Sequence, residues 1–381
     1  MKILAIVADI DKNNFGGAEW HFEEVLKRLL PRLESITLLV GPNNNIRSVF
    51  SDSKVSILPV KYPHITNFYG ALFILYSLPI VLKLASENKY DLIWAKQEFP
   101  QGVVAAIVHL IFKIPLYVTS QSARLNKDEL VIRGNVPNAV KDFFSDLLTP
   151  VISFVFKNSN MVGAVSKFSA QQAIKLGAKN VVVVPNGVDL SLYRKSKSDS
   201  KSGGFQIVTT SSLISRNAVD ILIKACHLLP TEINWKLKIA GDGILRSDLG
   251  QLAEKLKISK KVEFLGRVAN DKIPNLLADS HLFVRVSRAE GFGSSFIEAM
   301  AAKIPVIGTP VGGIVDFITN NRTGLLVDVN DPEQLSKSIA RIYNQPNLQR
   351  RLTTNAYKMI LTKYNWENIS QEVWQSWNSI L

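Results

Sequence analysis

The stretch SRAEGFGSSFIEAMAAKIPVIGTPVGG, residues 287–313, places two glutamates, Glu290 and Glu298, around glycines and the expected start of a helix. An apolar run at 281–287 leads into this stretch, and another follows at 304–310. A strand, a glycine-containing loop, a helix and a second strand, in this order, indicate a parallel β–α–β unit. The loop after the first strand then lies at the carboxyl edge of a sheet, where such folds bind ligands.

The residue types in this loop suit a large anionic ligand. Gly291 and Gly293 carry no Cβ, so a ligand can approach the backbone closely. We expect Ser294 to cap a helix whose first N–H groups and dipole favour an anion. Helical side chains tilt toward the N-terminus, so the Glu298 carboxylate can reach back and accept hydrogen bonds from sugar hydroxyls. The pattern suits a nucleotide sugar; alternatively, the two glutamates only favour the helix dipole.

Short apolar runs alternate with helix-length segments on both sides of a hydrophilic stretch at 190–204. The runs expected to be strands are 2–8, 35–41, 55–60, 91–96, 115–120, 161–166 and 180–186, then 205–212, 235–241, 261–266, 281–287, 304–310 and 324–329. Apolar strands without strict alternation, separated by helices, predict parallel sheets covered on both faces. We therefore expect an α/β protein with two Rossmann-like, doubly wound domains, 1–195 and 203–360, facing a central cleft. An amphipathic helix within 361–381 is expected to pack back across the domains.

The composition narrows the class of protein. The 381 residues carry a formal net charge of +13 and one cysteine, Cys226, which excludes an internal disulfide and fits a reducing compartment. The first residues, MKILAIVADIDKNN, are more typical of a buried strand than of a signal peptide. The apolar stretches 70–85 and 103–118 are interrupted by proline and charge and fall short of a spanning helix, so we expect core helices. The chain shows no nucleic-acid motif and no Cys/His metal spacing, which leaves anionic ligands or an anionic membrane surface to explain the charge.

Residues 287–313 resemble the retaining glycosyltransferases of family 4, which have the two-Rossmann GT-B fold, and share their E-x7-E spacing. Further matches follow in the family's order: NFGGAE (14–19), AVSKFS (164–169), VPNGVD (184–189), IAGDGILRSDL (239–249), EFLGRV (263–268) and TGLLVDVNDPEQL (323–335). The resemblance implies retaining transfer of a hexosyl group from a UDP-, GDP- or ADP-linked sugar to a glycan, polyprenyl-linked or lipid acceptor. It implies no metal, no other cofactor, no nucleic-acid partner and a cytoplasmic location, with peripheral contact at the inner membrane face left open.

The resemblance also assigns roles to residues. Glu290 would support the transferred sugar as positive charge develops, and Glu298 would bind the ribose. Arg267 and Val268 would lie near the base. The remaining donor contacts would come from backbone N–H groups and close-approach glycines of two loops: Gly16 and Gly17, and Gly291, Phe292, Gly293, Ser294 and Ser295. The match IAGDGILRSDL contains a GDG that we interpret as a turn ahead of a helix.

The chain departs from the family's pattern at two places. A pattern like G-R-L-x-x-x-K-G usually follows the first strand of the C-terminal domain, and its Arg and Lys are assigned to the diphosphate. Ser212 and Asn217 stand at these positions here. We expect Asn217 to bind substrate and the adjacent Arg216 to replace the lost charge in catalysis. Many members carry a histidine after the fifth strand. Here it is Gln121, which can bind a sugar hydroxyl but cannot act as a base, and Arg124 follows as a second candidate.

These departures keep two alternatives open. One is a non-catalytic or specialised GT-B scaffold with an altered diphosphate site, and the other is a sugar-nucleotide epimerase. On the acceptor side, the segments 68–76 and 140–157 are rich in aromatic and aliphatic residues. They are expected to be packed helices, or else an apolar patch that meets a membrane or a lipid-linked acceptor.

Overall fold

The computed structural model describes residues 1–8, 17–42, 52–63, 69–121, 138–193 and 204–381. The chain forms two compact units, one of Met1–Asn186 with Trp366–Leu381 and the other of Gly187–Asn365. The chain therefore passes from one unit to the next at Asn186, earlier than the expected boundary at 195–203. Residues 366–381 return to the first unit.

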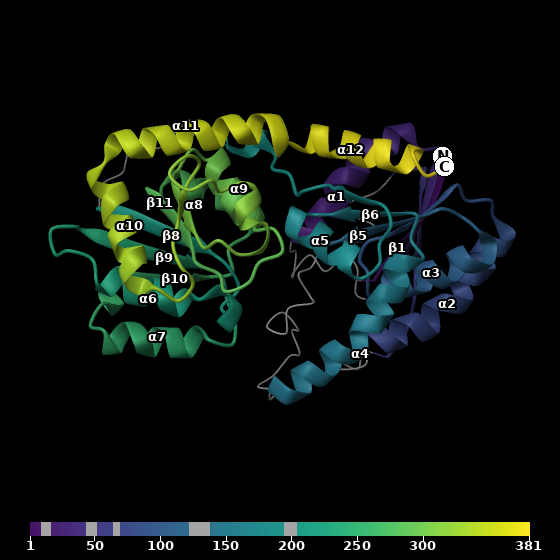
Figure 1. The fold of residues 1–381 in the computed structure, drawn as a ribbon, viewed down its shortest axis with the longest axis horizontal. Coiled ribbons are helices and arrows are strands. Elements are labelled where there is room, and N and C mark those ends of the chain that lie inside the picture. The colour runs from purple at the N-terminus through teal and green to yellow at the C-terminus, as the bar shows by residue number, and fades with distance from the viewer. Residues whose placement is uncertain (9–16, 43–51, 64–68, 122–137, 194–203) are drawn as a thin grey trace. The chain divides into compact units, whose positions relative to one another are not determined.

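The first unit is built on a seven-stranded parallel sheet (Figure 1). Its strands, all predicted from the apolar runs, are β1 (Lys2–Val7), β2 (Ser35–Val40), β3 (Val55–Pro59), β4 (Leu92–Ala95), β5 (Leu116–Ser120), β6 (Met161–Ala164) and β7 (Val181–Val183). The strand order is β3-β2-β1-β4-β5-β6-β7. The order reverses between β1 and β4, so a ligand crevice is expected at their carboxyl ends.

The helices of this unit cover the sheet. They are α1 (Gly17–Leu29), a 3-10 turn η2 (Leu30–Arg32), α2 (Tyr69–Glu87), α3 (Gln101–Phe112), α4 (Asn138–Lys157), α5 (Lys167–Lys175) and α12 (Trp366–Asn378). The amphipathic pattern predicted for the tail is confirmed: four residues of α12 are at most 1% exposed, namely Trp366, Ile369, Val373 and Trp377. Helix α12 packs against α1, and the Trp377 ring meets Trp94 of β4 with centroids 5.0 Å apart.

Helix α2 corrects the expectation of a core helix at 70–85. It runs through Pro79 for 19 residues, and its buried positions form a single stripe of Phe73, Ser77, Val81 and Ala85. Among the described residues it is the one helix whose length and apolar composition would allow it to cross a membrane, and 22% of that apolar window is buried. The second apolar stretch is closer to the expectation, because half of the residues of α3 are buried and the helix leads into β5.

The second unit holds a six-stranded parallel sheet in the order β10-β9-β8-β11-β12-β13. The predicted runs again become the strands: β8 (Phe205–Thr210), β9 (Trp235–Ala240), β10 (Val262–Gly266), β11 (Leu282–Arg285), β12 (Val306–Gly308) and β13 (Leu325–Leu326). The helices are α6 (Val219–His227), α7 (Arg246–Lys255), α8 (Ile273–Ala278), α9 (Ser294–Ala301), α10 (Pro332–Asn344) and α11 (Pro346–Lys363). Five 3-10 turns join them: η5 (Leu190–Tyr193), η6 (Ser215–Asn217), η7 (Ser259–Lys261), η8 (Asn270–Lys272) and η9 (Gly312–Asp316).

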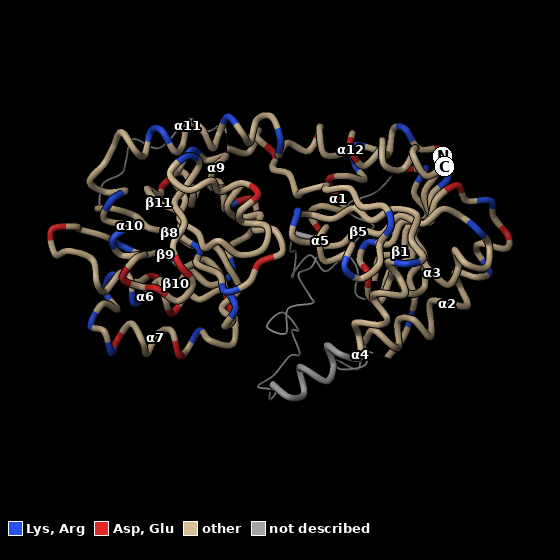
Figure 2. Tube along the Cα trace, viewed as in Figure 1, with Lys and Arg blue, Asp and Glu red and all other residues tan. Residues whose placement is uncertain are grey.

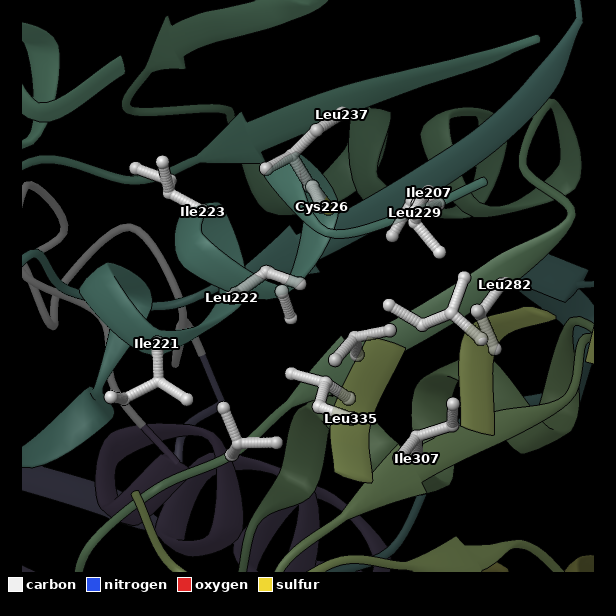
Figure 3. Packing of buried hydrophobic residues seen from close by; sticks show 14 of the residues in the cluster. Ile207, Ile221, Leu222, Ile223, Cys226, Leu229, Leu237, Leu282, Ile307 and Leu335 are labelled. Atoms are coloured by element: carbon white, nitrogen blue, oxygen red, sulfur yellow. The ribbon is translucent and has the colours of Figure 1, made fainter. Parts of the chain in front are cut away.

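The core of the second unit lies between its sheet and the helices α6 and α10 (Figure 3). Ile207 of β8 and Leu282 of β11 meet Leu222 of α6 and Leu335 of α10, each at most 1% exposed. Burying one such side chain contributes about 2 kcal/mol. This packing holds the strands in register, so the loops at their carboxyl ends start from fixed positions.

A buried histidine makes the stability of the first unit depend on pH. His21 of α1 is 2% exposed, and burial lowers its pKa to about 4, although a hydrogen bond with Asn186 opposes that shift. A lowered pKa means that His21 stabilises the fold above its unfolded value of about 6.5. This contribution disappears as the pH falls toward 4.

We therefore expect the free energy of unfolding to lose about 2 kcal/mol through His21 between pH 7 and pH 4.5. Urea unfolding of the wild type and of His21→Gln at both pH values measures the difference, since contributions from other groups cancel. His227→Gln, at an exposed histidine of α6, is the control and should follow the wild type. Equal pH dependence in wild type and His21→Gln would contradict the assignment.

Candidate active site

The carboxyl edge of the second sheet gathers the loops that carry the sequence motifs. Residues 211–217 follow β8, 241–243 follow β9, 267–268 follow β10, and 286–293 follow β11. All six strands are parallel, so these loops emerge at one edge. Figure 1 shows β8, β9, β10 and β11 side by side with α9 beside them.

Helix α9 begins at Ser294, as predicted, but its cap differs from the expectation. The capping residue is Gly293, with φ +97°, and no side chain caps the helix. The expected serine cap is therefore wrong, because the chain turns into the helix through a left-handed glycine one residue earlier. The first N–H groups of a helix have no partner within its regular ladder, and here the Phe296 N–H donates to the Gly293 carbonyl at 3.0 Å.

The loop before α9 is held by packing on both sides. The Phe292 ring is buried against Phe317 and Tyr364, with centroids 5.4 and 5.9 Å away. On the other side, Gly312 lies directly against the carbonyl of Glu290, so that a Cβ at Gly312 would stand 1.6 Å from that oxygen. These contacts fix the backbone of Glu290, whose side chain is 11% exposed.

The Glu290 carboxylate meets an arginine that sequence analysis missed. Arg285 is the last residue of β11, and its Nη2 lies 2.5 Å from Glu290 Oε2. The approach is an ion pair by distance but lacks the directions of a hydrogen bond, and Oε2 accepts no hydrogen bond from the described residues. Glu290 Oε2 therefore faces the Arg285 guanidinium and can still accept a hydrogen bond from a hydroxyl group.

Arg285 connects three loops of the site. Its Nε donates to Ser287 Oγ at 3.2 Å, and its Nη1 donates to Ser295 Oγ, in the first turn of α9, at 3.0 Å. Its Nη2 donates to Asn217 Oδ1, in the loop after β8, at 3.1 Å. The guanidinium therefore stands between the start of α9 and the loop 211–217.

Glu298 lies one turn into α9 and is half-buried. Burial raises its pKa to about 7, while the nearby Arg285 guanidinium acts in the opposite direction. The carboxyl group is therefore poised between its charged and neutral forms near neutral pH. Tyr193 of η5, a second residue that sequence analysis did not select, also belongs here, because burial and then the charge of Glu298 raise the pKa of its phenol.

Two family models match this chain. The model for Glycosyltransferase Family 4 matches residues 15–192, and the model for Glycosyl transferases group 1 matches residues 194–359. The chain belongs to the family 4 glycosyltransferases. Its two parallel sheets are the two Rossmann-like domains of the GT-B fold.

This glycosyltransferase is similar to several proteins over most of their length. An uncharacterised glycosyltransferase of Methanocaldococcus jannaschii is 27% identical over 92% of this chain and 91% of its own length. A phosphatidylinositol N-acetylglucosaminyltransferase subunit from Arabidopsis thaliana is 23% identical over 97% of this chain and 80% of its own length. Among solved structures, Anabaena HepE in complex with UDP-glucose superposes with a TM-score of 0.80 at 23% identity, covering all of both chains.

Ser212 and Asn217, at the family's Arg and Lys positions, are uncharged and bond to other groups of the protein. Ser212 is exposed, and its carbonyl accepts a hydrogen bond of 2.7 Å from the Asn217 amide. The other end of that amide accepts from Arg285. Asn217, predicted to bind substrate, is 3% exposed and joins protein groups, so it supports Arg285 and the loop. Arg216, the predicted replacement cation, is half-buried in η6.

The GDG motif precedes α7, as expected of a turn ahead of a helix, and its glycines also allow close packing. Gly241, at φ +150°, is so close to the loop after β8 that a Cβ would lie 1.8 Å from the Ser211 carbonyl oxygen. A Cβ at Gly243 would lie 2.4 Å from the Leu213 carbonyl oxygen. The two glycines let the loops after β8 and β9 pack backbone to backbone beside Asn217.

The other predicted contacts are spread over both units. Arg267 is exposed and Val268 half-buried at the carboxyl end of β10, on the same edge as Glu290. In the first unit, Gly17 is the first residue of α1 and Gln121 follows β5. Gly16 and Arg124 lie outside the described residues. At the same edge of that sheet, Lys96 after β4 pairs with Glu19 of α1 at 2.8 Å, a buried ion pair that sequence analysis missed.

The described residues contain no cluster of three or more His, Cys, Asp or Glu side chains that could hold a metal ion. Lys and Arg positions are interspersed with Asp and Glu along helices such as α7, as Figure 2 shows.

Proposed function

We propose that this glycosyltransferase moves a hexosyl group, with retention and without a metal, from a nucleotide sugar to a glycan, polyprenyl-linked or lipid acceptor. The observation that carries the proposal is the pair of glutamates, Glu290 and Glu298, around the first turn of α9 at the carboxyl edge of its sheet. The solved complex of HepE with UDP-glucose supports a nucleotide-sugar donor. The name of the Arabidopsis relative, which refers to phosphatidylinositol, supports a lipid acceptor.

The site suits a donor that has an anion between two hydroxyl-rich parts. The start of α9 offers N–H groups and the positive end of a helix dipole to the diphosphate. Glu298 accepts hydrogen bonds from the ribose hydroxyls, and Glu290 faces the sugar. Both glutamates start from fixed backbone positions, because Gly312 packs against the carbonyl of Glu290 and Glu298 lies within α9.

In the proposed reaction, the bond between the sugar C1 and the β-phosphate oxygen breaks, and its electron pair stays on the phosphate. The acceptor oxygen forms its bond to C1 on the same face, and its proton passes to the phosphate oxygen. Positive charge develops on the sugar while the bond breaks, and the Glu290 carboxylate stabilises it. No protein base is needed, which fits Gln121 after β5.

The first experiment is a thermal-shift and calorimetry screen of UDP, GDP, ADP and their sugar conjugates against the wild type and Glu298→Ala. A ligand that binds the native state raises the melting temperature by mass action. We expect one nucleotide to stabilise the wild type and not the variant. Absence of binding by any of them at millimolar concentration contradicts the proposed donor site and favours the scaffold alternative.

The affinity for that nucleotide should also depend on pH. The pKa of Glu298 is raised to about 7, so its carboxylate form increases from roughly a tenth to nine-tenths between pH 6 and pH 8. Ribose hydroxyls bond the charged form more strongly, so affinity should rise up to about tenfold with pH. Calorimetry on wild type and Glu298→Gln measures this, and a variant with the same pH dependence as the wild type excludes Glu298 as its source.

We also propose that the first unit meets an anionic membrane surface. Helix α2 packs on α3, and α3 packs on α4. Their outer surfaces expose large apolar side chains: Leu75, Tyr76, Ile80, Leu110, Ile111, Leu147 and Phe154. Lys83, Lys113 and Lys157 are exposed on or beside the same helices. Apolar side chains flanked by lysines are typical of surfaces that rest on anionic lipids.

We expect Leu75→Glu with Ile111→Glu to weaken binding to vesicles containing phosphatidylglycerol by about tenfold or more. The charges oppose insertion and repel the lipid headgroups. Vesicle co-sedimentation measures binding, with phosphatidylcholine vesicles as the uncharged comparison. Leu361→Glu, at an exposed leucine of α11, is the control. Unchanged binding of the double variant would contradict the proposed face.

A further inference from the structure

The Arg285 guanidinium stands at an electrostatically unfavourable place, beside the start of a helix. Through Ser295 Oγ it contacts the first turn of α9, which is the positive end of that helix. A cation is not stabilised there by the helix. The Glu290 carboxylate balances it at 2.5 Å but makes no hydrogen bond with it. A cation and a helix N-terminus that converge on one place form a site for an anion.

The hydrogen bonds of Arg285 leave donors for such an anion. The guanidinium has five N–H groups. Among the described residues, three of them donate: one to Ser287, one to Ser295 and one to Asn217. One N–H on each terminal nitrogen therefore makes no hydrogen bond with the described residues, and arginine N–H groups bind phosphate oxygens well. The side chain is 12% exposed, so water weakens such bonds little.

The neighbours of Arg285 fix it in this place. Asn217 is held from its other end by the Ser212 carbonyl, so its Oδ1 is directed at the guanidinium. Ser287, whose side chain accepts from Nε, is fully buried, and its carbonyl accepts from Thr309. Three acceptors, two of them held by the surrounding structure, therefore orient the planar guanidinium, which lowers the entropy lost when it binds an anion.

We propose that Arg285 is the cation that binds the diphosphate of the donor. It reaches from the end of β11 to the position where Asn217 stands in place of the family's lysine. This inference rests on the proposed function. When the bond to the sugar breaks, the electron pair stays on the phosphate, and the Arg285 guanidinium stabilises that added charge. Glu290 is its counter-ion in the unliganded site, and binding of the diphosphate gives Arg285 a second anionic partner.

The test compares ligands with and without the diphosphate. We expect Arg285→Met to weaken binding of the matching nucleoside diphosphate by about 10- to 100-fold, and binding of the corresponding nucleoside by less than about threefold. Arg285→Lys keeps the charge but loses the fork, so an intermediate loss of about three- to tenfold is expected. Arg341→Ala, which removes an arginine bonded to Asn321 on the surface, should bind both ligands like the wild type.

A second variant distinguishes direct contact between Arg285 and the diphosphate from a purely structural role of Arg285. Adding Asn217→Lys to Arg285→Met returns an ammonium group to the same place, so diphosphate affinity should recover to within about fivefold of the wild type. Equal losses for nucleoside and diphosphate, without rescue, would show a merely structural role and overturn the proposal. If Arg285→Met and Arg285→Lys bind the diphosphate as well as the wild type does, the proposal for Arg285 is overturned. The proposed function then remains intact. A wild type that binds no nucleotide refutes the proposed function itself.

Discussion

Glu290→Gln should lower the rate at which nucleotide is released from the matching nucleotide sugar by about 10²- to 10³-fold. In the absence of an acceptor, slow transfer of the sugar to water reports the same bond cleavage. Gln has the size of Glu but no charge, so it cannot stabilise positive charge on the sugar. It also leaves the Arg285 guanidinium without its counter-ion in a largely buried place. A nucleoside diphosphate carries no reacting sugar, so its binding depends neither on that stabilisation nor on the counter-ion. Its affinity should therefore fall by less than about tenfold.

The control is Glu333→Gln, at an exposed glutamate in the first turn of α10. It removes the same charge from a helix start in the same unit, so its release rate should equal that of the wild type. Nucleotide release and calorimetric affinity are measured on the same preparations. If Glu290→Gln releases nucleotide within about threefold of the wild type, Glu290 does not stabilise the reacting sugar.

The strands were predictable because their physical requirement is simple. A strand in a covered parallel sheet must be apolar on both faces, as in KILAIV and SITLLV, and each such run became a strand. The start of α9 was also predictable, since a glycine loop precedes a run of small and apolar residues. Its cap was not, because Gly293 and Ser294 are both good capping residues and only the φ of +97° distinguishes them.

Arg285 was missed although its signal is present in HLFVRVS. It is the one charged residue of β11, and it stands at the carboxyl end of that strand, where such folds bind ligands. Its role depends on partners 68 and 10 residues away in sequence, Asn217 and Ser295, which only the fold brings together. The substitution at Asn217 looks like a loss in sequence, whereas in the structure the same loop meets a cation from another strand.

The surface of α2 was mispredicted for a similar reason. Composition shows that the segment is apolar but cannot show how much of it other helices cover. Its buried stripe repeats every four residues, and the side chains between these positions, such as Leu75 and Ile80, stay exposed. An apolar helix at the surface therefore has the same sequence pattern as one in the core.

Gly312→Ala should destabilise the second unit by about 4 kcal/mol and abolish sugar transfer together with it. The added Cβ would lie 1.6 Å from the Glu290 carbonyl oxygen and 2.7 Å from its carbonyl carbon, both backbone atoms that no side-chain rotation can move. The φ of +53° adds about 1 kcal/mol for any residue with a Cβ. The loop that carries Glu290 must therefore shift, and the contact with Arg285 is lost.

Gly266→Ala separates the two causes. Gly266 has a similar φ of +67°, but a Cβ there would meet nothing within 4 Å. Gly266→Ala should lower the free energy of unfolding only by the conformational cost of about 1 kcal/mol. The difference between the two variants in chemical unfolding then gives the cost of the steric clash at Gly312. If Gly312→Ala is no less stable than Gly266→Ala, the backbone of 288–293 can move without penalty. Such a loop could not hold Glu290 in place, and the argument that a fixed carboxylate supports the reacting sugar would fail with it.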